Sequence, residues 1–119
     1  GTPAIQPLVI LHKRLKNISR TDEEAEEVIP DHLRDQEEKV LHDILRQTEP
    51  TIRRHLELRE FRAVAAEILQ IKPVIDNFFD NILVMAKEEE LRRNRIALVR
   101  KVDQILMQVA DFTRIMESD

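Results

Sequence analysis

Hydrophobic residues recur along the chain at spacings of three and four, which is the pattern of one face of an α-helix. In the last third they step by 7, 4, 3, 4, 3 and 4 through Leu91, Leu98, Val102, Ile105, Val109, Phe112 and Met116. This pattern predicts a helix from about Glu88 to Phe112, with Met85 to Lys87 as the connection before it.

A second hydrophobic pattern begins at Arg59 and runs to Ile82. Its apolar positions are Phe61, Val64, Ala65, Ile68, Ile71, Ile75, Phe78 and Ile82. Pro73 lies inside this pattern, and a proline removes a backbone donor and clashes with the carbonyl one turn before it. We therefore expect a helix with a kink or a break near Ile71.

The first half of the chain divides into three parts. Leu8, Leu11, Leu15 and Ile18 predict a helix after Pro7, and Thr21 to Glu24 fits a capping box at the start of an acidic linker or short helix over residues 21–30. Asp31 is expected to cap the next helix, which runs to about Gln47. Pro50 either kinks that helix or begins a short continuation through Leu56. Its expected core positions are Leu33, Val40, Leu41, Ile44 and Leu45.

Composition favours an all-α fold. The chain has 119 residues, one glycine and no cysteine, and a β-rich fold of this size would need turn glycines. We predict a single domain over residues 1–119, an antiparallel bundle of four to five helices. Gly1 is interpreted as a cloning remnant. The absence of cysteine suits a reducing cytoplasm, and no apolar stretch approaches the roughly 20 residues that span a membrane.

Charge is distributed unevenly along the chain, whose net charge is −4. Residues 1–20 hold four cations and no acid, whereas residues 22–31 hold six acids. By helical phase one face of the first helix carries Lys13, Lys16, Asn17 and Arg20. This face is interpreted either as a solvated lysine surface or as a binding surface for phosphate groups.

Catalytic and metal-binding signatures are not found in the sequence. Four histidines occur, but none has another histidine or a cysteine at ligand spacing. His42 has Glu38 one turn before it, which we interpret as ordinary surface pairing. No glycine-rich phosphate loop or nucleophile motif occurs. We therefore assign no catalytic residue, metal ligand or cofactor to this chain, which leaves binding as its expected role.

Four short motifs resemble a known family. They are KRLKNI at Lys13–Ile18, FFDNILVM at Phe78–Met85, LRRNR at Leu91–Arg95 and LMQVADF at Leu106–Phe112. Together they resemble the carboxy-terminal end of the beta subunit of bacterial glycyl-tRNA synthetase, which carries K-R-V-x-N-I, F-F-D-x-V-x-V-M, L-R-x-N-R and V-A-D blocks in this order. The region is similar to the DALR anticodon-binding domain of arginyl-tRNA synthetases.

This resemblance implies a helical domain that holds the anticodon stem-loop of glycine tRNA. It also implies that the chain is an excised part of a ligase whose aminoacylation chemistry, with ATP and magnesium, lies chiefly on a separate alpha subunit. The alternative from a different class is a structural bundle that docks against another protein.

By resemblance, Lys13, Arg14 and Asn17 match the first block, and the expected tRNA contacts are completed by Lys16, Arg20, Asn94 and Arg95. Two interpretations stay open for the last pair. Asn94 could instead tie the Met85–Lys87 connection, and Arg95 could form a structural ion pair. The Phe78–Phe79 pair is expected in the core, and Asp80 is expected to pair with a cation of a neighbouring helix.

Overall fold

The computed structural model describes residues 27–118, with side chains described as far as Asp111. This part of the chain contains the 3-10 helix η1 (Pro30–His32) and three α-helices, α2 (Gln36–Glu57), α3 (Phe61–Asn81) and α4 (Glu89–Ser118). No strand occurs between residues 27 and 118, so the all-α class is confirmed. The predicted helix after Pro7 and the capping box at Thr21–Glu24 lie outside the described residues.

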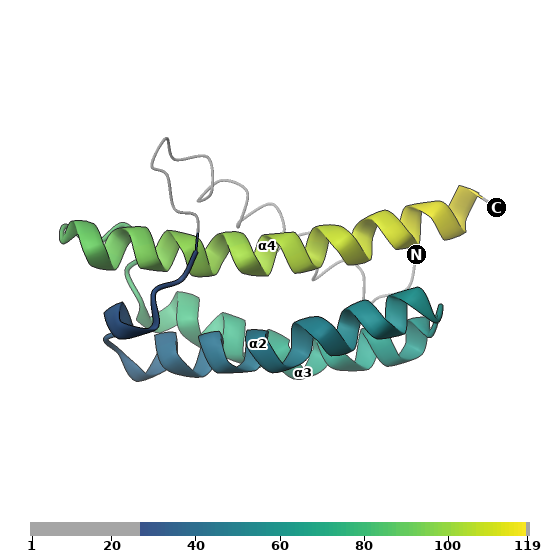
Figure 1. Ribbon diagram of the computed structural model, residues 1–119, viewed down its shortest axis with the longest axis horizontal. Helices are drawn as coiled ribbons and strands as arrows, with labels where there is room; N and C mark the ends of the chain where they lie inside the picture. Colours follow the sequence, from purple (N-terminus) through teal and green to yellow (C-terminus); the bar gives the residue numbers. More distant parts are fainter. Residues whose placement is uncertain (1–26, 119) are drawn as a thin grey trace.

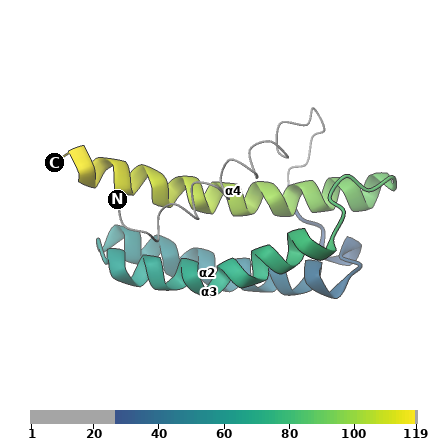
Figure 2. The same cartoon turned by 180° about the vertical axis from the view of Figure 1, so that it is seen from behind.

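The three α-helices lie side by side along one axis (Figures 1 and 2). α2 and α3 form one layer, and α4 packs across this layer with the same direction as α2 and the opposite direction to α3. η1, the start of α2 and the connection over residues 82–88 lie at the same end of the bundle, at the left of Figure 1. None of the described helices is both long enough and apolar enough to cross a membrane.

Neither internal proline divides a helix. Pro50 lies inside α2 and Pro73 lies inside α3. The break considered near Ile71 is therefore wrong, whereas the alternative of a kink stays a prediction. α2 continues past the expected end near Gln47 and includes the predicted continuation through Leu56. Both prolines are on exposed positions, where water can bind the carbonyl left without a donor one turn earlier. Three long helices therefore occupy the span for which the sequence suggested shorter pieces, and the predicted count of four to five is too high for the described part.

The start of α2 also differs from the prediction. Asp31 lies inside η1, which has Pro30 at its first position. Asp35 is the N-cap of α2 and forms a capping box with Glu38. The pattern D-x-x-E, which signals such a start, is present in the sequence at these positions.

A turn without glycine joins α2 to α3. The amide of Arg59 donates to Leu56 O and that of Glu60 donates to His55 O, at 3.1 and 2.8 Å. These two bonds form the C-terminal arrangement that usually places a glycine in the left-handed region. Here Arg59 takes that place with φ of 58°, which costs about 1 kcal/mol for a residue with a Cβ.

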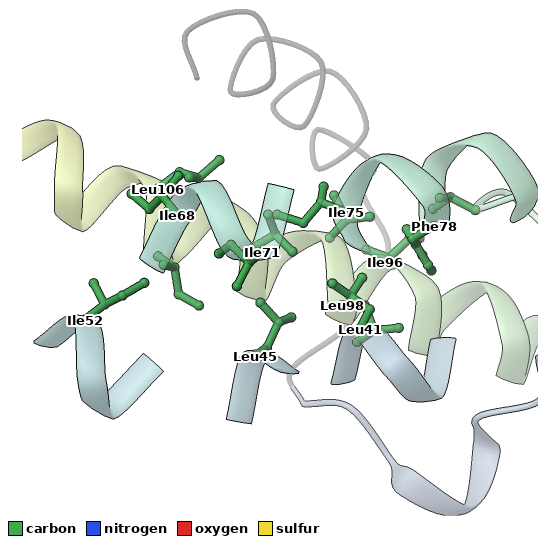
Figure 3. Packing of buried hydrophobic residues seen from close by; sticks show 14 of the residues in the cluster. Leu41, Leu45, Ile52, Ile68, Ile71, Ile75, Phe78, Ile96, Leu98 and Leu106 are labelled. Atoms are coloured by element: carbon green, nitrogen blue, oxygen red, sulfur yellow. The ribbon is translucent and has the colours of Figure 1, made fainter. Parts of the chain in front are cut away.

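The hydrophobic core lies between the layers and contains side chains from all three α-helices (Figure 3). Phe78 is fully buried and packs edge-on against the partly buried Phe79, with ring centroids 5.4 Å apart, as expected. The expected core position at Val40 is wrong, since Val40 is 40% exposed. Ala65, an apolar position of the pattern in α3, is also exposed. The side chains of Phe112 and Met116 lie outside the described residues.

Replacing Leu41 tests the core. Leu41 has no exposed surface, whereas Leu69 on α3 is 59% exposed. We expect Leu41→Ala to lower the free energy of unfolding by about 2–5 kcal/mol, because it leaves a cavity, and Leu69→Ala to lower it by less than about 1 kcal/mol. Urea unfolding followed by circular dichroism measures both, since the chain has no tryptophan or tyrosine. Equal losses in the two variants would contradict this placement of the core.

Candidate nucleic-acid interface

Arg95 is the centre of a buried polar network at one end of the bundle. Its side chain is 7% exposed, and its Nη2 lies 2.8 Å from Oε1 of Glu38 and 3.1 Å from Oδ2 of Asp35. Nε donates to the same Glu38 oxygen at 3.1 Å, and Nη1 donates to the backbone carbonyl of Leu83 at 2.7 Å. One guanidinium therefore joins α4, the start of α2 and the connection that follows α3.

Glu38 has a double role in this network. Its Oε1 accepts from Arg95 and, at 3.3 Å, from the backbone amide of Asp35. The side chain has no exposed surface, and its Oε2 has no hydrogen-bond partner among the described residues. The expected surface pairing of Glu38 with His42 is therefore wrong. A carboxylate buried this completely depends on its cation, because the alternative is an uncompensated charge away from water.

Asn94 ties down the segment before η1. Its Oδ1 accepts from the amide of Ile29 at 2.7 Å, and its Nδ2 donates to the carbonyl of Ile29 at 3.2 Å. Asn94 is 3% exposed, so both ends of the amide are used inside the protein. The segment it fixes is not the Met85–Lys87 connection considered from the sequence, which instead binds Arg92 through the carbonyls of Ala86 and Lys87.

The expected tRNA contacts thus fall into two groups. Five of them, Lys13, Arg14, Lys16, Asn17 and Arg20, lie outside the described residues. Asn94 and Arg95 are both buried and bonded inside the protein. Arg95 forms the structural ion pair left open for it, whereas Asn94 ties the Ile29 segment and not the Met85–Lys87 connection. Asp80 is exposed and pairs with no cation in the described part of the chain, so its predicted ion pair is wrong.

Several cations on the described surface are paired with carboxylates. The pairs within 4.0 Å are Arg34–Glu88, Arg53–Glu49, Lys72–Asp76, Arg93–Glu89 and Lys101–Glu49. Such exposed pairs stabilise the fold little, but each acid lowers the positive potential available to a phosphate. Arg46, on the exposed face of α2, lies outside these pairs. Among the side chains described between residues 27 and 111, no three or more of His, Cys, Asp or Glu gather into a group that could hold a metal ion.

His42, one helical turn before Arg46, is partly buried. Burial lowers the pKa of His42 below its ordinary value of 6.5, the positive charge of Arg46 lowers it further, and the carboxylate of Asp43 opposes both. The imidazole is therefore neutral at pH 7, when one ring nitrogen donates a hydrogen bond and the other accepts one.

Comparison with known proteins identifies the fold family. Residues 8–116 match the model of the DALR anticodon binding domain. The chain belongs to the DALR anticodon-binding domain family. Arg95, the centre of the buried network of this DALR domain, lies in LRRNR, one of the four blocks that suggested the family from the sequence.

The DALR domain is similar to glycine–tRNA ligase beta subunits of several bacteria. It is 36% identical to that of Myxococcus xanthus over 97% of this chain and 17% of the relative. The identity is 33% to that of Persephonella marina, over 95% and 16%, and 34% to that of Thermodesulfovibrio yellowstonii, over 87% and 15%. The chain thus spans about a sixth of the length of these relatives. No solved structure matches it significantly.

The Arg95 network predicts a specific response to mutation. Arg95→Met leaves Glu38 buried without a cation, so we expect the free energy of unfolding of the DALR domain to fall by about 3–5 kcal/mol. Adding Glu38→Leu removes the orphaned charge, and the double variant should be more stable than the single one. Arg93→Met, which breaks an exposed pair, should cost less than about 1 kcal/mol. If urea unfolding shows that the double variant is no more stable than Arg95→Met, this account is contradicted.

His42 predicts a pH dependence of stability. Because its pKa is lower in the folded DALR domain than in the unfolded chain, the unfolded chain takes up the proton first as pH falls through 6.5. Below this pH the free energy of unfolding of wild type should therefore fall relative to that of His42→Gln. Above about pH 8 the difference between the two free energies should be constant. Urea unfolding at a series of pH values measures the difference. A difference that stays constant down to pH 5 would contradict the assignment.

Proposed function

We propose that this DALR domain is the part of a glycine–tRNA ligase beta subunit that binds and positions the anticodon stem-loop of glycine tRNA. The match to an anticodon-binding family over nearly the whole chain carries this proposal. Similarity to glycine–tRNA ligase beta subunits supplies the identity of the tRNA. Residues 1–119 would form one domain of that subunit.

Within this proposal, the cationic face of residues 13–20 makes the principal RNA contacts. Lys13, Arg14, Lys16 and Arg20 would hold backbone phosphates, and the amide of Asn17 would contact a base edge as donor and acceptor. Asn94 and Arg95 would act from inside, by fixing the Ile29 segment and the 82–88 connection. Their bonds to those segments support this division.

Aminoacylation would take place elsewhere in the parent enzyme. We propose that ATP and magnesium bind outside this domain, chiefly on the alpha subunit, and that the domain contacts the rest of the beta subunit in a cytoplasmic complex. This placement is supported by the sequence, which has no glycine-rich phosphate loop.

Docking against another protein is a second candidate function, and one observation favours it. Leu83 and Met85, on the connection between α3 and α4, are 70% and 50% exposed. Apolar side chains exposed next to one another on a loop are typical of a contact with another protein surface. A docking role predicts binding that tolerates salt, whereas contacts between cations and phosphates release counterions and weaken as salt rises.

Titration with RNA tests the proposed function. We expect the chain to bind the anticodon stem-loop of glycine tRNA more tightly than a loop with an altered anticodon. Raising salt from about 50 to about 200 mM should weaken the binding by about tenfold or more. Lys13→Glu should weaken binding to both loops, and Asn17→Ala should reduce the difference between them. Fluorescence anisotropy with labelled RNA measures each affinity.

Two outcomes would count against this assignment. Equal affinity for the two loops would indicate a basic surface that does not distinguish anticodons. Binding of neither loop, together with salt-tolerant binding to the remainder of the beta subunit, would favour the docking role.

A further inference from the structure

A cleft with a volume of about 410 Å³ lies between α2 and α4. This size is within the range of roughly 300–1,000 Å³ that small-ligand pockets occupy. We call it the α2–α4 cleft. Its floor is apolar and belongs to the core, since Leu45, Ala97 and Leu98 are each at most 4% exposed. Leu45 on α2 and Leu98 on α4 both belong to the core drawn in Figure 3.

The rim of the α2–α4 cleft is polar and carries mainly positive charge. α2 contributes His42 and Arg46, one helical turn apart, and α4 contributes Arg100, Lys101 and Gln104 over the same length of helix. Glu27 is the single acid of the lining. Lys101 is held at 2.7 Å by Glu49, whereas Arg46 is exposed at the cleft edge.

These groups suit one unpaired nucleotide. A neutral imidazole and a side-chain amide can each donate to and accept from a base edge, and a guanidinium can hold the phosphate that follows. The positive charge of Arg46 that lowers the pKa of His42 also acts on any phosphate at the rim. A nonpolar peptide would leave these polar groups without partners, which disfavours a protein occupant.

We propose that the α2–α4 cleft receives one unpaired nucleotide of the anticodon loop, with Arg46 on its phosphate and Gln104 on its base edge. This inference rests on the proposed function and extends it, because it adds a specificity-determining contact on α2 and α4 to the one proposed for Asn17. It assigns a role to Arg46 and Gln104, which no sequence motif singled out.

The matched control is Arg62, an exposed arginine on α3 that does not line the cleft. With the glycine anticodon stem-loop as the probe, Arg46→Glu should weaken binding of the 119-residue chain by about tenfold and Gln104→Ala by about fivefold or more. Arg62→Glu makes the same charge change away from the cleft and should weaken binding by less than about threefold. Circular dichroism checks that the variants fold, and Gln104→Ala leaves the net charge unchanged.

A double-mutant cycle locates the nucleotide. Each loop nucleotide is made abasic in turn and is bound to wild type and to Gln104→Ala. At the seated position the two changes should be non-additive, because either one alone removes the same contact. Additive effects at every position would overturn the inference.

The outcomes separate the two proposals. If wild type distinguishes anticodons but the cleft variants bind as wild type does, or Arg62→Glu weakens binding as much as Arg46→Glu, the cleft inference is overturned and the proposed function stands. If wild type does not distinguish the loops, both are overturned.

Discussion

The ion pair of Arg95 with Glu38 is the interaction on which one whole end of the bundle depends. Helix packing alone fixes α2, α3 and α4 side by side, but it does not fix the non-helical segments between them. Arg95 joins Asp35 at the start of α2, Glu38 inside it and the carbonyl of Leu83 in the connection. A buried pair of this kind adds little net stability compared with apolar residues, but it is costly to break, so it selects one arrangement of these segments.

The helical parts of the fold could be predicted from the sequence because they depend on local periodicity. The phases of Leu41, Ile68 and Ile105 follow from spacings of three and four, and all three are buried. The helices continue through Pro50 and Pro73, where the sequence left open whether each helix continues. The energetic cost of a proline inside a helix depends on whether the carbonyl one turn before it can reach water, and this is a property of the folded surface. The exposure of Val40 was not predicted for a related reason, because the neighbouring helices set the width of the buried face of α2.

The polar network could be predicted only in part. The D-x-x-E pattern at residues 35–38 signals the start of α2, and the resemblance of LRRNR to a family block marked Asn94 and Arg95 as significant. Their partners could not be found, since Glu38 lies 57 residues from Arg95 and Ile29 lies 65 residues from Asn94. The motif thus identified the family correctly, and Asn94 and Arg95 bind other segments of the domain in this structure.

These observations distinguish the residues that stabilise the domain from those that could bind RNA. Buried cations such as Arg95 are committed to carboxylates and carbonyls, and many exposed ones lie beside acids. A chain of net charge −4 can still attract RNA where its cations are grouped, because phosphate binding depends on local charge at close range. In the described part, the rim of the α2–α4 cleft is where cations, an amide and an apolar floor occur together. Selectivity for one loop would then come from the shape of the bundle as much as from its charge.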